Sequence, residues 1–81
     1  MNKYSLWAQI RKDRVGRCSV RVTAIPLNSR VLPQPGDCVS DTAISFVEAT
    51  GLRDRLVAAL KKTVEGRGDA VMAIESLVTE E

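Results

Sequence analysis

Two stretches of alternating residues constrain the fold of this 81-residue chain more than any other feature. They cover residues 4–11 and 18–25, and this period of two is typical of a half-buried β-strand. The apolar side of the two stretches consists of Tyr4, Leu6, Ala8 and Ile10, followed by Cys18, Val20, Val22 and Ala24. Pro26 lacks the N–H that a sheet needs and ends the second stretch. Gly16, in the charged connection between them, suits a tight turn. The sequence therefore predicts an antiparallel hairpin.

A second pattern, later in the chain, has the spacing of an amphipathic helix. We expect this helix over Leu52–Glu65, with Thr50 as its N-cap and with Gly66 and Gly68 at its end. The apolar residues that recur at helical spacing are Leu52, Leu56, Val57, Leu60 and Val64. Such a helix buries one stripe, so it is expected to cover one face of a sheet.

The remaining segments give weaker patterns. Leu27–Ser40 contains Pro33, Pro35 and Gly36 and predicts a loop. The β-branched and aromatic residues of Ala43–Ala49 favour a third strand, although Asp41 could equally cap a short helix. Asp69–Val78 fits a strand that is apolar on both faces or a helix. We favour the strand, because it can complete a sheet through a parallel crossover. Thr79–Glu81 is expected to be a frayed acidic tail.

Together these segments predict one α+β domain over residues 1–81. Its expected architecture is a three- or four-stranded, mainly antiparallel sheet in β-β-β-α-β order, with one amphipathic helix on one face. A hydrophobic content of 44 % is typical of a globular domain. No apolar run approaches the roughly 20 residues that span a bilayer, and the start lacks a secretory signal. We therefore expect a cytoplasmic protein with no membrane partner, and the excess of Arg over Lys favours a bacterial source.

Several kinds of chemistry have no support in the sequence. There is no histidine, which removes the usual general base and the commonest metal ligand. No glycine-rich phosphate loop is present, and the carboxylates are scattered. The sequence thus predicts a non-enzymatic protein with no catalytic residue, cofactor or metal. Cys18 and Cys38 are expected to be buried and reduced, the alternatives being a bridge between them or a reactive thiol.

Charge is divided unevenly along the chain. The first 30 residues hold seven basic residues and one acidic residue, whereas the remainder holds five basic and nine acidic residues. The basic hairpin makes five side chains candidates for nucleic-acid contact: Arg11, Lys12, Arg14, Arg17 and Arg21. The alternative is a solvated turn whose charges protect a sheet edge from aggregation.

Trp7 is the other candidate for function. Its side chain is on the other face of its strand from Tyr4 and Leu6. A single helix that packs against the Tyr4 and Leu6 face cannot also cover the Trp7 face, so Trp7 is a candidate interface residue. The alternative is that loop Leu27–Val39 folds over it. We therefore expect a binding protein that self-associates as a homodimer through a sheet face or an edge strand and acts through protein–protein contacts. Nucleic-acid binding through the hairpin is the alternative function, and a small-molecule pocket at a dimer interface is a third.

Overall fold

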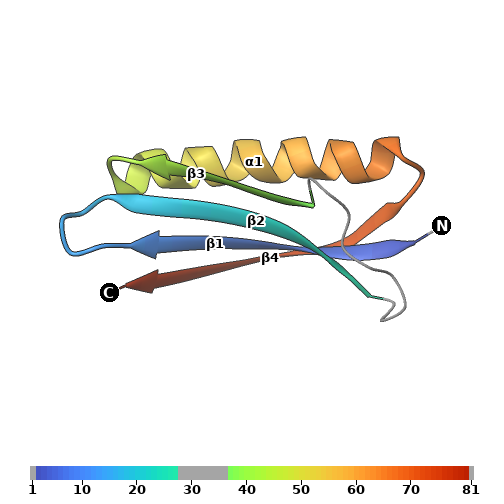
Figure 1. The fold of residues 1–81 in the computed structure, drawn as a ribbon, viewed down its shortest axis with the longest axis horizontal. Coiled ribbons are helices and arrows are strands. Elements are labelled where there is room, and N and C mark those ends of the chain that lie inside the picture. Colours follow the sequence, from blue (N-terminus) through green and yellow to red (C-terminus); the bar gives the residue numbers. More distant parts are fainter. Residues whose placement is uncertain (1, 28–36, 81) are drawn as a thin grey trace.

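The computed structural model describes residues 2–27 and 37–80. Within these residues the elements run β1 (Lys3–Lys12), β2 (Cys18–Pro26), β3 (Cys38–Ala43), α1 (Phe46–Gly66) and β4 (Ala70–Glu80). The strands form one sheet in the order β3-β2-β1-β4, and α1 lies along one face of it (Figure 1). This arrangement confirms the predicted α+β class and the β-β-β-α-β order. The sheet is mixed, because β1–β2 and β2–β3 are antiparallel while β1–β4 is parallel.

The predicted hairpin forms as the alternation indicated. Its register places Trp7 opposite Thr23 and Gln9 opposite Arg21. In the turn, Gly16 has a φ of 91°, a backbone conformation that glycine adopts without strain. The Asp13 carboxylate holds the turn, since its Oδ1 accepts hydrogen bonds of 2.9 Å from two backbone N–H groups, those of residues 15 and 17.

The core lies between the hairpin and α1. All eight side chains predicted to face inward from the two strands are at most 2 % exposed. Leu60 and Val64 of α1 pack on the half of this face near Tyr4, and Ala49 and Leu52 pack on the half near Ile10. The helix therefore covers β1, β2 and β3, and the amphipathic stripe predicted from the sequence is the one it buries.

The third strand and the start of the helix differ from the prediction. Ala43–Ala49 is not a strand, because β3 ends at Ala43 and α1 begins at Phe46. The N-cap is Ser45, whose Oγ accepts a 3.1 Å hydrogen bond from the Glu48 N–H, and not Thr50, whose hydroxyl donates to a carbonyl within the helix. A Ser followed three residues later by Glu is the signature of a helix start, and here it outweighs local β propensity.

The ends of two segments also differ from those predicted from the sequence. The predicted loop Leu27–Ser40 lies largely in residues 28–36, outside the described part of the chain, and its last three residues belong to β3. Thr79 and Glu80 are not a frayed tail: they pair with Arg11 and Lys12 at the end of β4. The preference for a strand over Asp69–Val78 is confirmed, and its parallel pairing with β1 is the predicted crossover.

The two thiols have different surroundings. Cys18 is buried, as expected, whereas Cys38 is exposed, so its predicted burial is wrong. Both are free, and no bridge joins them. The Thr23 hydroxyl donates to the Cys38 Sγ at 3.6 Å. Cys38 is on a sheet-edge strand and faces away from α1, in register with Thr23, which explains its exposure.

Replacing Cys18 with alanine should lower the free energy of unfolding by about 1 kcal/mol, because the sulfur fills space in the packed core. The matched control is Cys38→Ala, which should change stability by less than about 0.5 kcal/mol. Urea denaturation measures both. Thiol titration of the native protein should modify Cys38 rapidly and Cys18 only on unfolding; rapid modification of Cys18 would contradict its burial.

Candidate functional site

The face of the sheet opposite α1, here called the open face, alternates with the buried core positions. On β1 it carries Trp7, Gln9 and Arg11, and on β2 it carries Ser19, Arg21 and Thr23. The β3 and β4 residues in register with these complete it: Cys38, Ser40 and Thr42 on β3, and Glu75, Leu77 and Thr79 on β4. No helix of the described chain covers this face (Figure 1).

A shallow hollow of about 340 Å³ lies on the open face. Its lining includes two guanidinium groups, an amide and several hydroxyls, supplied by Arg11, Arg21, Gln9, Ser19, Ser40 and Thr79. Asp41 also borders it, and the Asp41 Oδ1 accepts a 2.8 Å hydrogen bond from the Thr42 N–H. Side chains from all four strands meet here, so the hollow exists only once the sheet is assembled. Its donors suit an anionic ligand with several oxygen atoms.

The five basic residues proposed as nucleic-acid contacts are divided by the fold. Arg11 and Arg21 lie together on the open face, at the hollow. Lys12 follows Ile10 on the helix side of β1 and pairs in register with Glu80 of β4. Arg14 is exposed in the turn, and Arg17 is held by Asp13, with 3.4 Å between Nε and Oδ2. The structure therefore does not bring all five together, and the pair on the open face is the part that shares a surface.

Trp7 lies on the open face, as the alternation predicted, and is half-buried. Its cross-strand neighbours are Thr23 of β2 and Glu75 of β4. The loop that was the alternative cover for Trp7 lies mostly outside the described residues. Trp7 thus presents part of its indole on the same surface as the two arginines, and its role as an interface residue stays a prediction.

The outer edge of β4 is a second surface, which the sequence reasoning missed. The strand order places β4 at one edge of the sheet. Its apolar side chains are half-exposed rather than buried on both faces as expected: Met72 56 %, Ile74 50 %, Leu77 46 % and Val78 45 %. Within β4 the charged residues are Glu75 and Glu80, and the strand contains no proline or lysine. Such an edge lacks two of the features with which natural sheets discourage pairing, namely proline and lysine.

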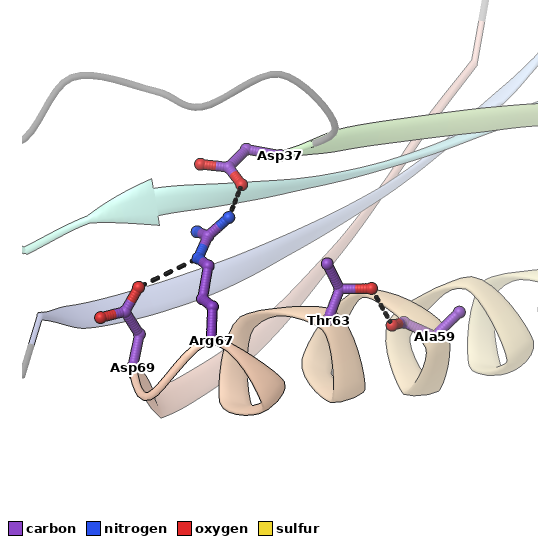
Figure 2. Close-up of polar contacts among 5 residues, drawn as sticks. All are labelled: Asp37, Ala59, Thr63, Arg67 and Asp69. Atoms are coloured by element: carbon purple, nitrogen blue, oxygen red, sulfur yellow. Dashed lines mark hydrogen bonds and ion pairs between the residues drawn. The ribbon is translucent and has the colours of Figure 1, made fainter.

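Arg67, just after α1, joins two segments that are far apart in the sequence (Figure 2). Its Nη1 lies 2.8 Å from Oδ1 of Asp37, and its Nε lies 3.0 Å from Oδ2 of Asp69. Its guanidinium carbon is 5.2 Å from the centre of the Tyr4 ring. The Asp37 side chain is only 3 % exposed. The hydrogen bond to Asp37 is the main cause that raises the pKa of Arg67, with a smaller contribution from Asp69.

This Arg67 cluster holds the fold together rather than presenting a surface to a ligand. It connects the end of α1 to the residue before β3, and the Asp69 Oδ1 also accepts a 3.2 Å hydrogen bond from the Asn2 N–H. Along the same helix, the Thr63 hydroxyl donates to the Ala59 carbonyl at 3.0 Å, a local helix contact that is also drawn in Figure 2. Sequence patterns could not indicate the ion pair, because its partners are 30 residues apart.

Within residues 2–27 and 37–80, no group of three or more His, Cys, Asp or Glu side chains is placed to hold a metal ion. In the same residues, no helix is long and apolar enough to cross a membrane. Comparisons with protein-family models, with curated proteins and with solved structures find no match. Two surfaces of the described chain are thus candidates for function, the open face and the edge of β4.

Proposed function

We propose that this protein is a non-enzymatic binding module that self-associates as a homodimer through antiparallel pairing of β4 with β4 of a second copy. The observation that carries the proposal is the edge of β4, an eleven-residue strand with half-exposed apolar side chains. An unpaired edge offers a row of backbone N–H and C=O groups to another strand. Pairing two such edges satisfies these groups and removes apolar surface from water.

The sequence of β4 suits pairing with itself. A register shift between β1 and β4 follows Val71 and leaves residues 73–80 in regular register. The middle of this stretch is near Ser76, and a two-fold axis there places Ile74 of one copy opposite Val78 of the other. Glu75 then lies opposite Leu77 of the other copy. This register avoids placing the two Glu75 carboxylates directly opposite each other, which would be unfavourable.

The contact between α1 and β4 is compatible with this axis. Arg53 of α1 reaches β4, with 3.1 Å between its Nη1 and the Ser76 Oγ. The two copies of Arg53 would approach the axis, but each carries a counter-ion, since its Nε lies 3.3 Å from Oδ1 of Asp54. A two-fold axis perpendicular to the sheet gives an eight-stranded sheet with both helices on the same side.

The first test removes the apolar edge. Replacing Ile74 and Val78 together with lysine should weaken dimerisation at least 100-fold, because four charges would then meet across the axis. Light scattering should give twice the chain mass of 8.9 kDa for the wild-type protein and the chain mass for the variant. The matched control is Ile44→Lys with Val47→Lys, which charges two apolar residues exposed by 79 % and 82 % away from β4.

The control variant should remain a dimer, and circular dichroism should show that both variants are folded. A monomeric wild-type protein at about 100 μM, or equal dissociation of the control, would contradict the proposal. A second test replaces Ser76 with cysteine in a chain that lacks Cys18 and Cys38. Opposed residues of antiparallel strands are about 4.5–5.5 Å apart at Cα, within the range of a disulfide. Oxidation should therefore give a covalent dimer, whereas Thr42→Cys at the β3 edge should not.

A further inference from the structure

We propose that the open face binds a single-stranded polynucleotide, with Arg11 and Arg21 at its phosphate groups and Trp7 beside its bases. This function goes beyond self-association and uses different residues. The proposal stands on the hollow that Arg11 and Arg21 share and on the aromatic residue that the same face presents.

The chemistry of the hollow favours phosphate. Arg21 is exposed at the centre of the open face, with Gln9 across from it on β1 and Ser40 across from it on β3. Within the described residues, Arg21 makes no ion pair and no side-chain hydrogen bond. Its planar guanidinium can therefore direct several N–H donors to one phosphate group, a geometry that lysine cannot reproduce. The surrounding amide and hydroxyl groups add neutral donors that suit the remaining phosphate oxygens.

The acidic residue on this surface, Glu75, defines a direction for the ligand. Asp41 borders the hollow, but it pairs in register with the buried Val20, which places its side chain on the helix side of β3. Glu75 pairs in register with Trp7, and its negative charge repels a phosphate group at that point. The phosphates are thus favoured near Arg11 and Arg21, while a base is favoured at Trp7. Base stacking on an aromatic ring is a general feature of single-strand binding and requires no specific sequence.

The shape of the sheet favours a single strand over a duplex. Four strands spaced about 4.8 Å apart give a face roughly 14–19 Å wide, whereas the major groove of B-DNA is about 12 Å wide. A two-stranded ribbon enters that groove, but the full sheet is too broad. A single strand can instead lie across an open sheet with its bases unstacked and accessible. The proposed site is therefore the sheet face and not the hairpin turn, where Arg14 and Arg17 lie.

The test is fluorescence anisotropy with labelled 15-nucleotide oligo(dT) and oligo(rU) at about 50 and 200 mM salt. Replacing Arg21 with glutamine should weaken binding about tenfold, the effect of losing one charge-assisted contact. It should also reduce the slope of log affinity against log salt by about 0.7. The Arg11→Gln, Arg21→Gln double variant should lose binding, and the intrinsic fluorescence of Trp7 should change when the wild-type protein binds.

Two controls make the same change of charge elsewhere. Arg55→Gln alters an exposed arginine of α1, and Arg14→Gln alters the hairpin turn. Both should retain affinity within about threefold of the wild-type protein. An equal loss for Arg55→Gln and Arg21→Gln would overturn the proposal, because it would show attraction by net charge alone. So would a larger loss for Arg14→Gln, tighter binding of a 15-base-pair duplex, or wild-type affinity weaker than about 100 μM at the lower salt.

The result is independent of the dimer. None of these variants changes β4. A wild-type protein that is a dimer by light scattering but does not bind oligonucleotide would therefore contradict the oligonucleotide proposal and leave the dimer proposal standing. A monomeric protein that binds oligonucleotide through Arg21 would contradict the dimer proposal and support the oligonucleotide proposal. If both proposals hold, the two open faces lie on the same side of one sheet, because the two-fold axis is perpendicular to it.

Discussion

Replacing Arg67 with methionine should lower the free energy of unfolding by about 3 kcal/mol, because the change removes the guanidinium that the buried Asp37 carboxylate contacts. The Asp37 side chain is 3 % exposed and lies 2.8 Å from the Arg67 guanidinium. This value is at the lower end of the effect of breaking a buried ion pair, because Arg67 is itself 29 % exposed and water can reach part of the site. The methionine keeps much of the packing of the arginine stem beside Tyr4.

Urea denaturation at one protein concentration measures this effect. The matched control is Arg53→Met, whose partner Asp54 is 73 % exposed, and it should cost less than about 1 kcal/mol. Adding Asp37→Asn to Arg67→Met should restore part of the loss, since the buried group is then neutral. A cost below about 1 kcal/mol for Arg67→Met would show that Asp37 does not depend on this cation.

The contribution of Arg67 should not vary with pH over the neutral range. Its pKa is raised in the folded protein, mainly by the hydrogen bond to Asp37. A raised pKa gives a stabilisation that is complete below the unfolded pKa and is lost only as the pH rises through the folded value. Both values are far above neutrality for arginine. The difference in stability between wild-type and Arg67→Met proteins should therefore be the same at about pH 6 and about pH 9.

Replacing Leu60 with alanine should lower the free energy of unfolding by about 3–4 kcal/mol, which combines the lost transfer free energy with the cavity left behind. Leu60 is 1 % exposed and packs against the inner face of β1 and β2, where Leu6 and Val22 lie. The rigid sheet on one side limits how far this site can collapse. A protein of this size has a total stability of only about 5–10 kcal/mol, so the variant should be close to unfolding at physiological temperature.

Val47→Ala is the matched control for Leu60→Ala. Val47 is in the same helix and is 82 % exposed, so its replacement should change stability by less than about 0.5 kcal/mol. Thermal and urea denaturation should agree on the order of the two variants. A cost below about 1.5 kcal/mol for Leu60→Ala would mean that α1 does not bury the predicted stripe against the sheet.

The parts of the fold that could be predicted are those whose periodicity reports burial directly. In the hairpin, every inward side chain from Tyr4 to Ala24 follows the alternation, because one face of these two central strands is covered by α1. The helix was predicted over Leu52–Glu65, where Leu52, Leu60 and Val64 are buried. Its first six residues, 46–51, were missed because Ile44, Phe46 and Val47 have β propensity, although the Ser45 and Glu48 capping pair was present in the sequence.

The remaining differences depend on strand order and on contacts distant in the sequence. β3 is a short edge strand with a polar sequence, and it forms because Val39 pairs with Val22 in the neighbouring strand. The apolar residues of β4 were expected to be buried on both faces, but β4 is an edge strand that α1 contacts without covering, which leaves them half-exposed. Arg11 and Arg21 were assigned correctly to neighbouring strands, whereas the hollow between them requires residues from all four strands.

The parallel pairing of β1 with β4 has a kinetic consequence. It brings Lys3 opposite Ala70, two residues separated by 67 positions, whereas the β1–β2 hairpin is local. Closing so long a loop is entropically costly, and chains dominated by such pairings cross a slower folding transition. Until β4 joins, the outer side of β1 is itself an unpaired edge beside a formed hairpin. A partly folded chain therefore exposes a strand with Leu6 and Ile10 next to vacant backbone groups, and this species should be the one most prone to aggregation during refolding.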